Sequence, residues 1–222
     1  MTPLQQFLTE LSAHNDRPWF AAHRAQYDAV REQWYADLDR LLAACAEWEP
    51  VAARLDGRTA SYRIYRDTRF SPDKTPYKTY FSARIEPRLP GGQRAAGWYI
   101  HAGIPGDYSG IFGGIWAPDS AQLRKLRHAI VDNIEEFEDI LNAPELRRLY
   151  PEWWGDRLKT IPKGWPRDHA QAPLLRLLNY GRDHEVDPRF FADPDWPLRA
   201  AEIMRPLKPM IDFLNYSLTE EV

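Results

Sequence analysis

The chain has 222 residues, 44% hydrophobic and 27% charged, a composition typical of a soluble globular protein with one substantial core. Its formal net charge of -3 argues against general affinity for DNA or RNA, which requires a basic surface that neutralises phosphates. The single cysteine excludes an internal disulfide, and no apolar run is long enough to span a bilayer. The first residues lack the features of a signal peptide. We therefore expect a cytoplasmic protein.

The first fifty residues have helical periodicity. Apolar residues recur at helical spacing between Leu4 and Leu11, which predicts a first helix. A second, long helix is predicted to begin near Arg17-Pro18, with Asn15 or Asp16 as its cap, and to end before Pro50. Its apolar stripe includes Cys45, which we therefore interpret as a core residue and not as a nucleophile.

Between about residues 60 and 116 the apolar period changes to two, which is typical of strands. Short turn sequences rich in Pro and Gly separate the later segments, so neighbouring strands should pair in chain order as an antiparallel meander. The predicted strands are Tyr62 to Ile64, Phe81 to Ile85, Trp98 to Ala102 and Ile111 to Ile115.

Helical periodicity returns after the predicted sheet. A helix should begin at Asp119 and continue through Phe137, and further helices are expected at about 144–150, 173–178 and 197–218, with irregular chain between 153 and 166. We predict one α+β domain over residues 1–222, with N-terminal helices at 3–48, an antiparallel sheet at 60–116 and a mainly helical part at 119–218.

One stretch, from Tyr62 to Ala83, gathers basic residues in an otherwise slightly acidic chain. It is predicted to leave one strand, cross a loop and enter the next strand. Because side chains alternate along strands, Arg66, Arg69 and Lys74 are the cations best placed to converge on the concave side of the loop. Arginine suits two-point contact with phosphate or carboxylate, and lysine adds a movable charge, so the stretch is a candidate anion site.

A structural alternative is that Asp67 and Asp73 pair with these arginines and only fix the loop. Two functional alternatives also stay open: a nucleic-acid-associated protein that uses the loop and aromatic rings, against which the acidic charge counts, and a non-catalytic module whose loop docks an acidic partner. Enzymatic activity, its catalytic residues and any cofactor are left undetermined by the sequence. Among the histidines, His101 on a predicted strand could act as an acid or base, and none shows metal-ligand spacing.

Three separated segments resemble one microbial family. They are N15-D-R-P-W-F20 with His23, Arg24 and Tyr27, then R63-I-Y-R-D-T-R-F-S-P-D-K-T-P-Y-K-T79 followed by G113-G-I-W116, and L158-K-T-I-P-K-G-W165 with His169. The combination resembles domain of unknown function family 2461, whose members are conserved hypothetical proteins. The chain departs from that pattern at His14, where an Asn is common, and at Pro72, where a Lys is frequent. The resemblance implies no activity, but it implies that these segments meet in space.

The candidate ligand site therefore combines the basic stretch with two residues from the later segments, and no metal is expected. Its members are Arg63, Arg66, Asp67, Arg69, Asp73, Lys74, Tyr77, Lys78, Trp116 and Lys163.

Overall fold

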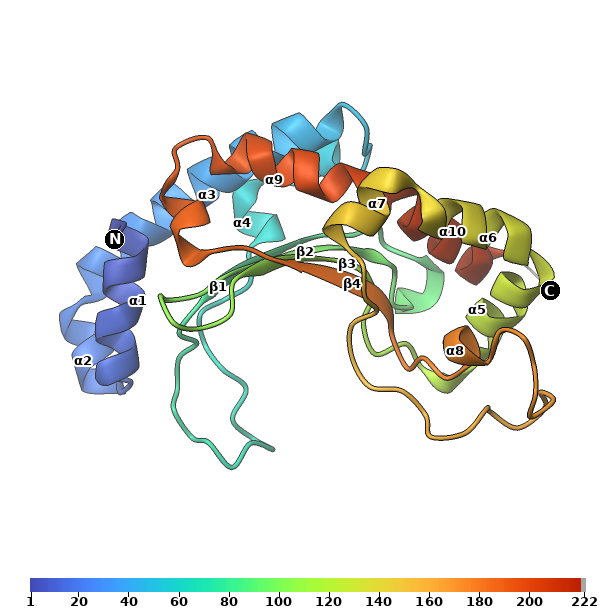
Figure 1. Ribbon diagram of the computed structural model, residues 1–222. Coiled ribbons are helices and arrows are strands. Elements are labelled where there is room, and N and C mark those ends of the chain that lie inside the picture. Colours follow the sequence, from blue (N-terminus) through green and yellow to red (C-terminus); the bar gives the residue numbers. More distant parts are fainter. Residues whose placement is uncertain (221–222) are drawn as a thin grey trace. The chain divides into compact units, whose positions relative to one another are not determined.

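The computed structural model describes residues 1–220 (Figure 1). The chain divides into two compact units, each built from three separate stretches. The first unit comprises Met1–Ile85, Tyr99–Ile111 and Glu185–Arg205, and the second comprises Glu86–Trp98, Phe112–His184 and the chain from Pro206 onward. The sequence predicted a single domain, and this division into two compact units does not test that prediction.

Four strands form one antiparallel sheet in the order β1-β2-β3-β4. Neighbours in the sheet are neighbours in the chain, so the predicted meander and the α+β class are confirmed. The strands are β1 (Phe81–Ile85), β2 (Gly97–Ala102), β3 (Gly110–Ile115) and β4 (Tyr180–Glu185).

Two strand predictions need correction. The segment Tyr62 to Ile64 is no strand, and the residues on either side of it make only isolated bridges, Ser61 with Ala83 and Tyr65 with Tyr77. The Arg66 N–H donates to the Pro76 carbonyl, but the reciprocal bond cannot form because proline has no N–H, which interrupts the ladder. Strand β4 lies outside the predicted sheet region, since its sequence YGRDHE has no apolar alternation to reveal it.

The first two helices of the first unit begin at side-chain caps, of which Asp16 was predicted and Thr2 was not. In α1 (Pro3–Ala13) the Thr2 hydroxyl accepts from Gln5 N at 3.1 Å, and in α2 (Arg17–Ala22) Asp16 accepts from Trp19 N at 2.8 Å. The predicted long helix is broken at His23, after which α3 (Arg24–Ala46) begins. There the imidazole stacks on Trp19 at 3.9 Å, and its Nδ1 lies 2.8 Å from the Trp19 carbonyl oxygen, so the side chain competes for a helical acceptor.

The core of the first unit lies between its helices and the first strands. Figure 1 shows α3, α4 (Gly57–Ala60) and α9 (Trp196–Met204) on one side of β1 and β2. Trp34 of α3 stacks on Trp196 at 5.5 Å and meets Phe81 edge-on at 5.7 Å, pairs that each contribute about 0.5–1.5 kcal/mol beyond area burial. Cys45 is fully buried in the same core, as predicted.

The second unit is mainly helical around the later strands. Asp119 caps α5 (Ser120–Asp132) as predicted, but the helix ends at Asn133 and α6 (Ile134–Asn142) follows. The helix predicted over 197–218 is likewise divided, because Pro206 cannot continue α9, and α10 (Lys208–Thr219) starts anew.

The remaining elements of the two units are short. They are α7 (Pro144–Leu149), α8 (Ala172–Leu175) and the 3-10 turns Ala52–Arg54, Pro90–Gly92, Pro188–Ala192 and Arg205–Leu207.

Two adjacent glycines of β3 allow close packing within the second unit. A Cβ at Gly113 would lie 2.4 Å from Leu207 Cδ1, and one at Gly114, which has φ 134°, would lie 2.1 Å from the Tyr180 carbonyl oxygen. The close neighbours are thus parts of the protein itself. Among the helices within residues 1–220, none combines the length and the apolar character that crossing a membrane requires.

Candidate functional site

The basic stretch forms a long loop whose two arms are held together near the sheet. Tyr62 N donates to Ser82 O at 2.8 Å, and Lys78 N donates to Ile64 O at 2.8 Å. From α1's end, the Asn15 side chain donates to Tyr77 O at 2.9 Å and accepts from Tyr77 N at 3.1 Å. These bonds fix the returning arm, so the side chain of Lys78 leaves a defined backbone position.

At the outer part of the loop, three cations are bound by the loop itself. Arg66 donates to both Asp73 and Thr75, and Arg69 forms a two-point pair with Asp67 at 3.0 and 2.7 Å. The Lys74 ammonium donates to the Thr68 carbonyl at 2.8 Å. The arginine hydrogen bonds lower the pKa of Asp67 and of Asp73 to about 2, so both carboxylates stay ionised at neutral pH. The ion pairs of the structural alternative are therefore present.

Lys78 differs from those three cations. Its side chain is half-buried, and its ammonium makes no hydrogen bond or ion pair within the described residues 1–220. The ammonium lies over the rings of Tyr62, at 5.2 Å from the centroid, and Tyr80, at 5.7 Å. Burial, followed by the charge of nearby Arg63, lowers the pKa of Lys78. A cation with two aromatic faces and no acid partner is the distinctive feature of this surface.

An imidazole and a third phenol complete the surroundings of Lys78, which we call the Lys78 cluster: Arg63, Lys78, Tyr62, Tyr80, Tyr99 and His101. His101 stacks on Tyr80 at 4.0 Å, and its Nδ1 lies 3.3 Å from the Tyr99 hydroxyl. These side chains come from the returning arm and from β2, on the face opposite the buried Trp98 and Ile100.

Burial shifts the protonation of this cluster toward neutral forms. It lowers the pKa of His101 to about 4, with a further contribution from the charge of Lys78, and it raises the pKa of Tyr99 to about 12. It also raises the pKa of Tyr80. At neutral pH the cluster therefore holds a neutral imidazole and protonated phenols beside a lysine, a combination that can bind an anion and move protons.

The structure places eight of the ten predicted site residues on this loop and its two arms, in the first unit. Tyr77 is buried and stacks on Phe20 at 4.0 Å, so it supports the loop from the core side. The other two belong to the second unit: Trp116 packs against Trp154 at 4.1 Å, and Lys163 is exposed in a turn before Gly164, which has φ 101°. The ligand-binding role of all ten stays a prediction.

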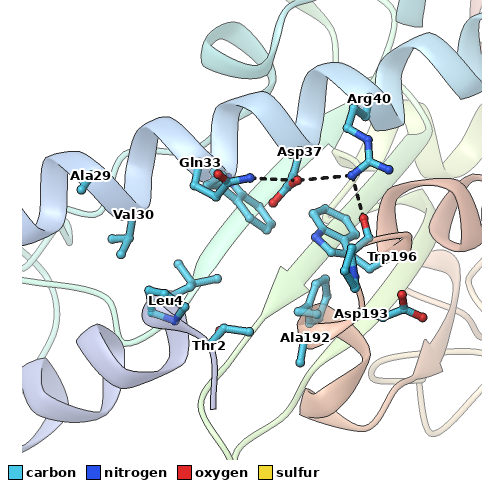
Figure 2. Close-up of a pocket in the computed structure, with 14 residues that line it drawn as sticks. Thr2, Leu4, Ala29, Val30, Gln33, Asp37, Arg40, Ala192, Asp193 and Trp196 are labelled. Atoms are coloured by element: carbon cyan, nitrogen blue, oxygen red, sulfur yellow. Dashed lines mark hydrogen bonds and ion pairs between the residues drawn. The ribbon is translucent and has the colours of Figure 1, made fainter.

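A separate cavity of about 490 Å³ lies along α3 and was not foreseen from the sequence. Figure 2 shows its polar side chains joined to one another: Gln33 to Asp37 and Asp37 to Arg40. Arg40 also donates to the Pro194 carbonyl at 2.6 Å and pairs with Asp195 at 3.1 Å. Because its arginine already has these partners, the cavity is a poorer anion site than the Lys78 cluster, and none of the ten predicted residues lines it.

The geometry gives little support for a metal site or for a cysteine nucleophile. Within residues 1–220, no group of three or more His, Cys, Asp or Glu side chains is placed to hold a metal ion. Burial raises the pKa of the Cys45 thiol to about 12, which leaves it protonated and unreactive.

Sequence reasoning did not include Tyr62, Tyr80 and Tyr99 in the candidate site. The available signal was strand parity, since Lys78 and Tyr80 share a face of the arm, as do Tyr99 and His101 on β2. No sequence pattern showed that the two pairs meet, because that depends on how β1 and β2 are joined. The anchoring role of Asn15 was likewise hidden, since its partner lies 62 residues away.

Comparison with known proteins gives one match. A family model described as conserved hypothetical protein (DUF2461) matches residues 4–213. No curated protein and no solved structure matches the chain.

Proposed function

The chain belongs to the conserved hypothetical family DUF2461, and we propose that it binds a small molecule carrying a phosphate or carboxylate group at the Lys78 cluster. The observation that carries the proposal is the half-buried Lys78 ammonium, which has aromatic neighbours but no acidic partner in the described chain. Arg63 is the second cation of the site, since its charge is close enough to lower the pKa of Lys78.

Energetics favour an anionic ligand at this position. Withdrawing an ammonium from water is unfavourable unless it is paired, and cation–π contacts offset only about 0.5–2 kcal/mol. Each hydrogen bond to a charged group contributes roughly 1.5–3 kcal/mol, so two such bonds correspond to about 3–6 kcal/mol, a dissociation constant between roughly several millimolar and tens of micromolar, which further ligand contacts would strengthen. The tyrosine rings offer such contacts to the body of the ligand.

The outer cations have a different part in this proposal. Arg66, Arg69 and Lys74 stabilise the loop through Asp73, Asp67 and the Thr68 carbonyl, so they shape the site and do not hold the ligand. This assignment differs from the convergence of those three cations expected from the sequence, and it can be tested separately. We also propose a cytoplasmic location. The free thiol of Cys45 is typical of a protein in a reducing compartment, and a small-metabolite ligand agrees with this location.

The test is calorimetric titration of the full chain with phosphate, citrate and a set of small carboxylates. Lys78→Ala should abolish binding, Arg63→Ala should weaken it, and Arg69→Ala and Lys74→Ala should change it little. Lys159→Ala, an exposed lysine of the second unit, is the matched charge control. Binding that survives Lys78→Ala unchanged, or that is lost equally in Lys159→Ala, contradicts the proposal.

A second candidate function rests on Phe70, at the outer part of the loop. Its side chain is 93% exposed, and the Arg69 guanidinium lies over its ring at 5.7 Å. A fully exposed aromatic beside a cation is typical of a contact residue for another macromolecule, so docking of an acidic protein partner is the alternative. Pull-down with wild type and Phe70→Ser distinguishes ligand binding from partner docking. A protein partner that wild type recovers and Phe70→Ser does not supports the interaction module.

A further inference from the structure

We propose that Lys78 is a nucleophile that forms an imine with the carbonyl group of an oxo acid, with His101 and Tyr99 transferring the protons. The inference rests on the anion site proposed above, because the carboxylate of the oxo acid has to be held beside the lysine. Arg63 would hold that carboxylate, which leaves the Lys78 nitrogen for the adjacent carbonyl carbon.

The geometry groups a lysine, an imidazole and a phenol, and the phenol of Tyr99 also has a side-chain hydrogen bond with Ser82. Lys78 Nζ lies over Tyr80, Tyr80 stacks on His101, and His101 contacts the Tyr99 hydroxyl, so the polar atoms follow one another along one face of the arm and β2. The Lys78 N–H bond to Ile64 and the strand position of His101 hold the backbone of both residues at defined positions. Catalytic groups require such rigid placement.

The protonation states suit amine attack. An amine is nucleophilic only when neutral, and lysines become so near neutral pH through burial or a neighbouring cation. Both influences act on Lys78, whose pKa is lowered first by burial and then by Arg63. His101 stays neutral at neutral pH, because its pKa lies at about 4, and Tyr99, with a pKa of about 12, keeps its proton, so the two groups can relay a proton without themselves becoming charged.

The reaction balances without any further reactant. The Lys78 ammonium first loses one proton to water, and the free amine attacks the carbonyl carbon, forming a C–N bond while the C=O π pair moves to oxygen. Proton transfer from nitrogen to that oxygen, relayed through Tyr99 and His101, gives a neutral carbinolamine. Hydronium returns the first proton to the hydroxyl, the C–O bond breaks, water leaves and a protonated imine remains. In total, ammonium and oxo acid become iminium and water.

Lys74 provides an internal comparison. It belongs to the same loop, but it is exposed and donates to the Thr68 carbonyl. It has neither the aromatic neighbours nor the imidazole of Lys78, so it reports the ordinary reactivity of a surface lysine in this segment.

The experiment is reductive trapping on the full chain. Wild-type protein is incubated with pyruvate, phenylpyruvate or 2-oxoglutarate and sodium borohydride, and the modified lysines are located by peptide mass mapping. We expect one dominant adduct on Lys78 and little on Lys74. His101→Gln and Tyr99→Phe should slow the trapping, since general acid–base catalysis typically contributes about 100-fold or more. Lys78→Arg keeps a positive charge but offers no comparable nucleophile, so it should give no adduct.

Binding measured with lactate and phosphate, which have no ketone or aldehyde group, separates the two proposals. If lactate or phosphate binds to wild type and to Lys78→Arg, and adducts form only at Lys78 of the wild type, both proposals stand. If these anions bind but adducts are absent or equally frequent on Lys74, the imine is wrong and the anion site stands. If neither binding nor a Lys78 adduct is found, both are wrong. The mapping of wild-type protein decides the matter even where a variant does not fold.

Discussion

The Asn15 side-chain amide pairs with both backbone polar groups of Tyr77, as a neighbouring strand would. Asn215 does the same for Ala96 in the second unit, where its oxygen accepts from Ala96 N at 2.8 Å and its nitrogen donates to Ala96 O at 3.0 Å. Each amide thus replaces a missing strand at a place where the ladder is absent. In the first unit, this bond lies next to Lys78 and controls how firmly the loop arm is held.

Replacement of Asn15 by Ala should therefore affect both stability and binding. Two backbone groups lose their partners, and we expect the free energy of unfolding to fall by about 1–3 kcal/mol in a urea titration. Amide hydrogen exchange should rise in residues 74–80, and anion affinity should fall. Asn215→Ala is the matched control, with a similar loss of stability but unchanged anion affinity. Equal effects of the two variants on anion binding would be inconsistent with the assigned site.

The depressed pKa of His101 predicts a specific pH dependence. Its folded value of about 4 lies below the unfolded value of 6.5, so between these values the unfolded chain binds the extra proton. Stability from this group is complete above pH 6.5 and is lost as the pH falls toward 4, with a limiting slope of about 1.4 kcal/mol per pH unit for one proton. The facing groups are Lys78, Asp107 and the rings of Tyr80, Tyr99 and Tyr108.

Urea unfolding at several pH values from 4 to 7 measures that slope. His101→Gln should flatten it in this window, and the imidazole signal of His101 in the NMR spectrum of the folded protein should titrate near pH 4. An imidazole that titrates near 6.5 in the folded protein would refute the burial argument.

The internal pair of Arg66 and Asp73 offers a test of which cations hold the ligand. Asp73→Asn removes the carboxylate charge that faces Arg66 and weakens the turn made with Thr75. We expect faster hydrogen exchange in residues 67–75 and little change in global stability, since exposed pairs contribute about 0–1 kcal/mol. Because Lys78 and Arg63 are the proposed ligand cations, anion affinity should change only slightly. A marked gain in anion affinity would instead indicate that Arg66 binds the ligand.

The adjacent glycines of β3 should differ in their tolerance of a methyl group. Gly113→Ala meets the side chain of Leu207, which can shift, so the overpacking should cost about 1–3 kcal/mol. Gly114→Ala meets the Tyr180 backbone and also has a positive φ of 134°, so it should be the more destabilising. Thermal unfolding of the two variants provides the comparison, and a more stable Gly114→Ala would show that β3 and β4 separate more easily than their contacts imply.

Much of the architecture could be predicted because it follows from local signals. The caps Thr2, Asp16 and Asp119 precede amphipathic segments, and the alternating stretches after residue 80 follow the sheet faces. Strand β4 escaped because its pairing with β3 depends on small and polar residues such as Gly181, whose absent Cβ leaves room for Phe112. Its strand character comes from tertiary packing and not from its own periodicity.

The sequence could indicate where the candidate site lies, but not the contacts of its individual side chains. Clustered charge located the loop, and strand parity put Lys78 and Tyr80 on one face. Charge counting could not distinguish cations that are bound by their own loop, such as Arg69, from a cation with no acid partner. That distinction depends on which carbonyls and carboxylates the folded loop turns inward, and Lys78 is identified only by its surroundings in three dimensions.

The bond from Lys78 N to Ile64 O separates the loop into two parts with different freedom to change. On the sheet side of this bond the backbone of Lys78 is fixed by pairing, whereas the residues between Asp67 and Asp73 are held mainly by contacts within the loop. Insertions or exchanges at the tip should therefore leave the backbone of Lys78 in place. If the proposed function holds, ligand preference could change at the tip without loss of the lysine.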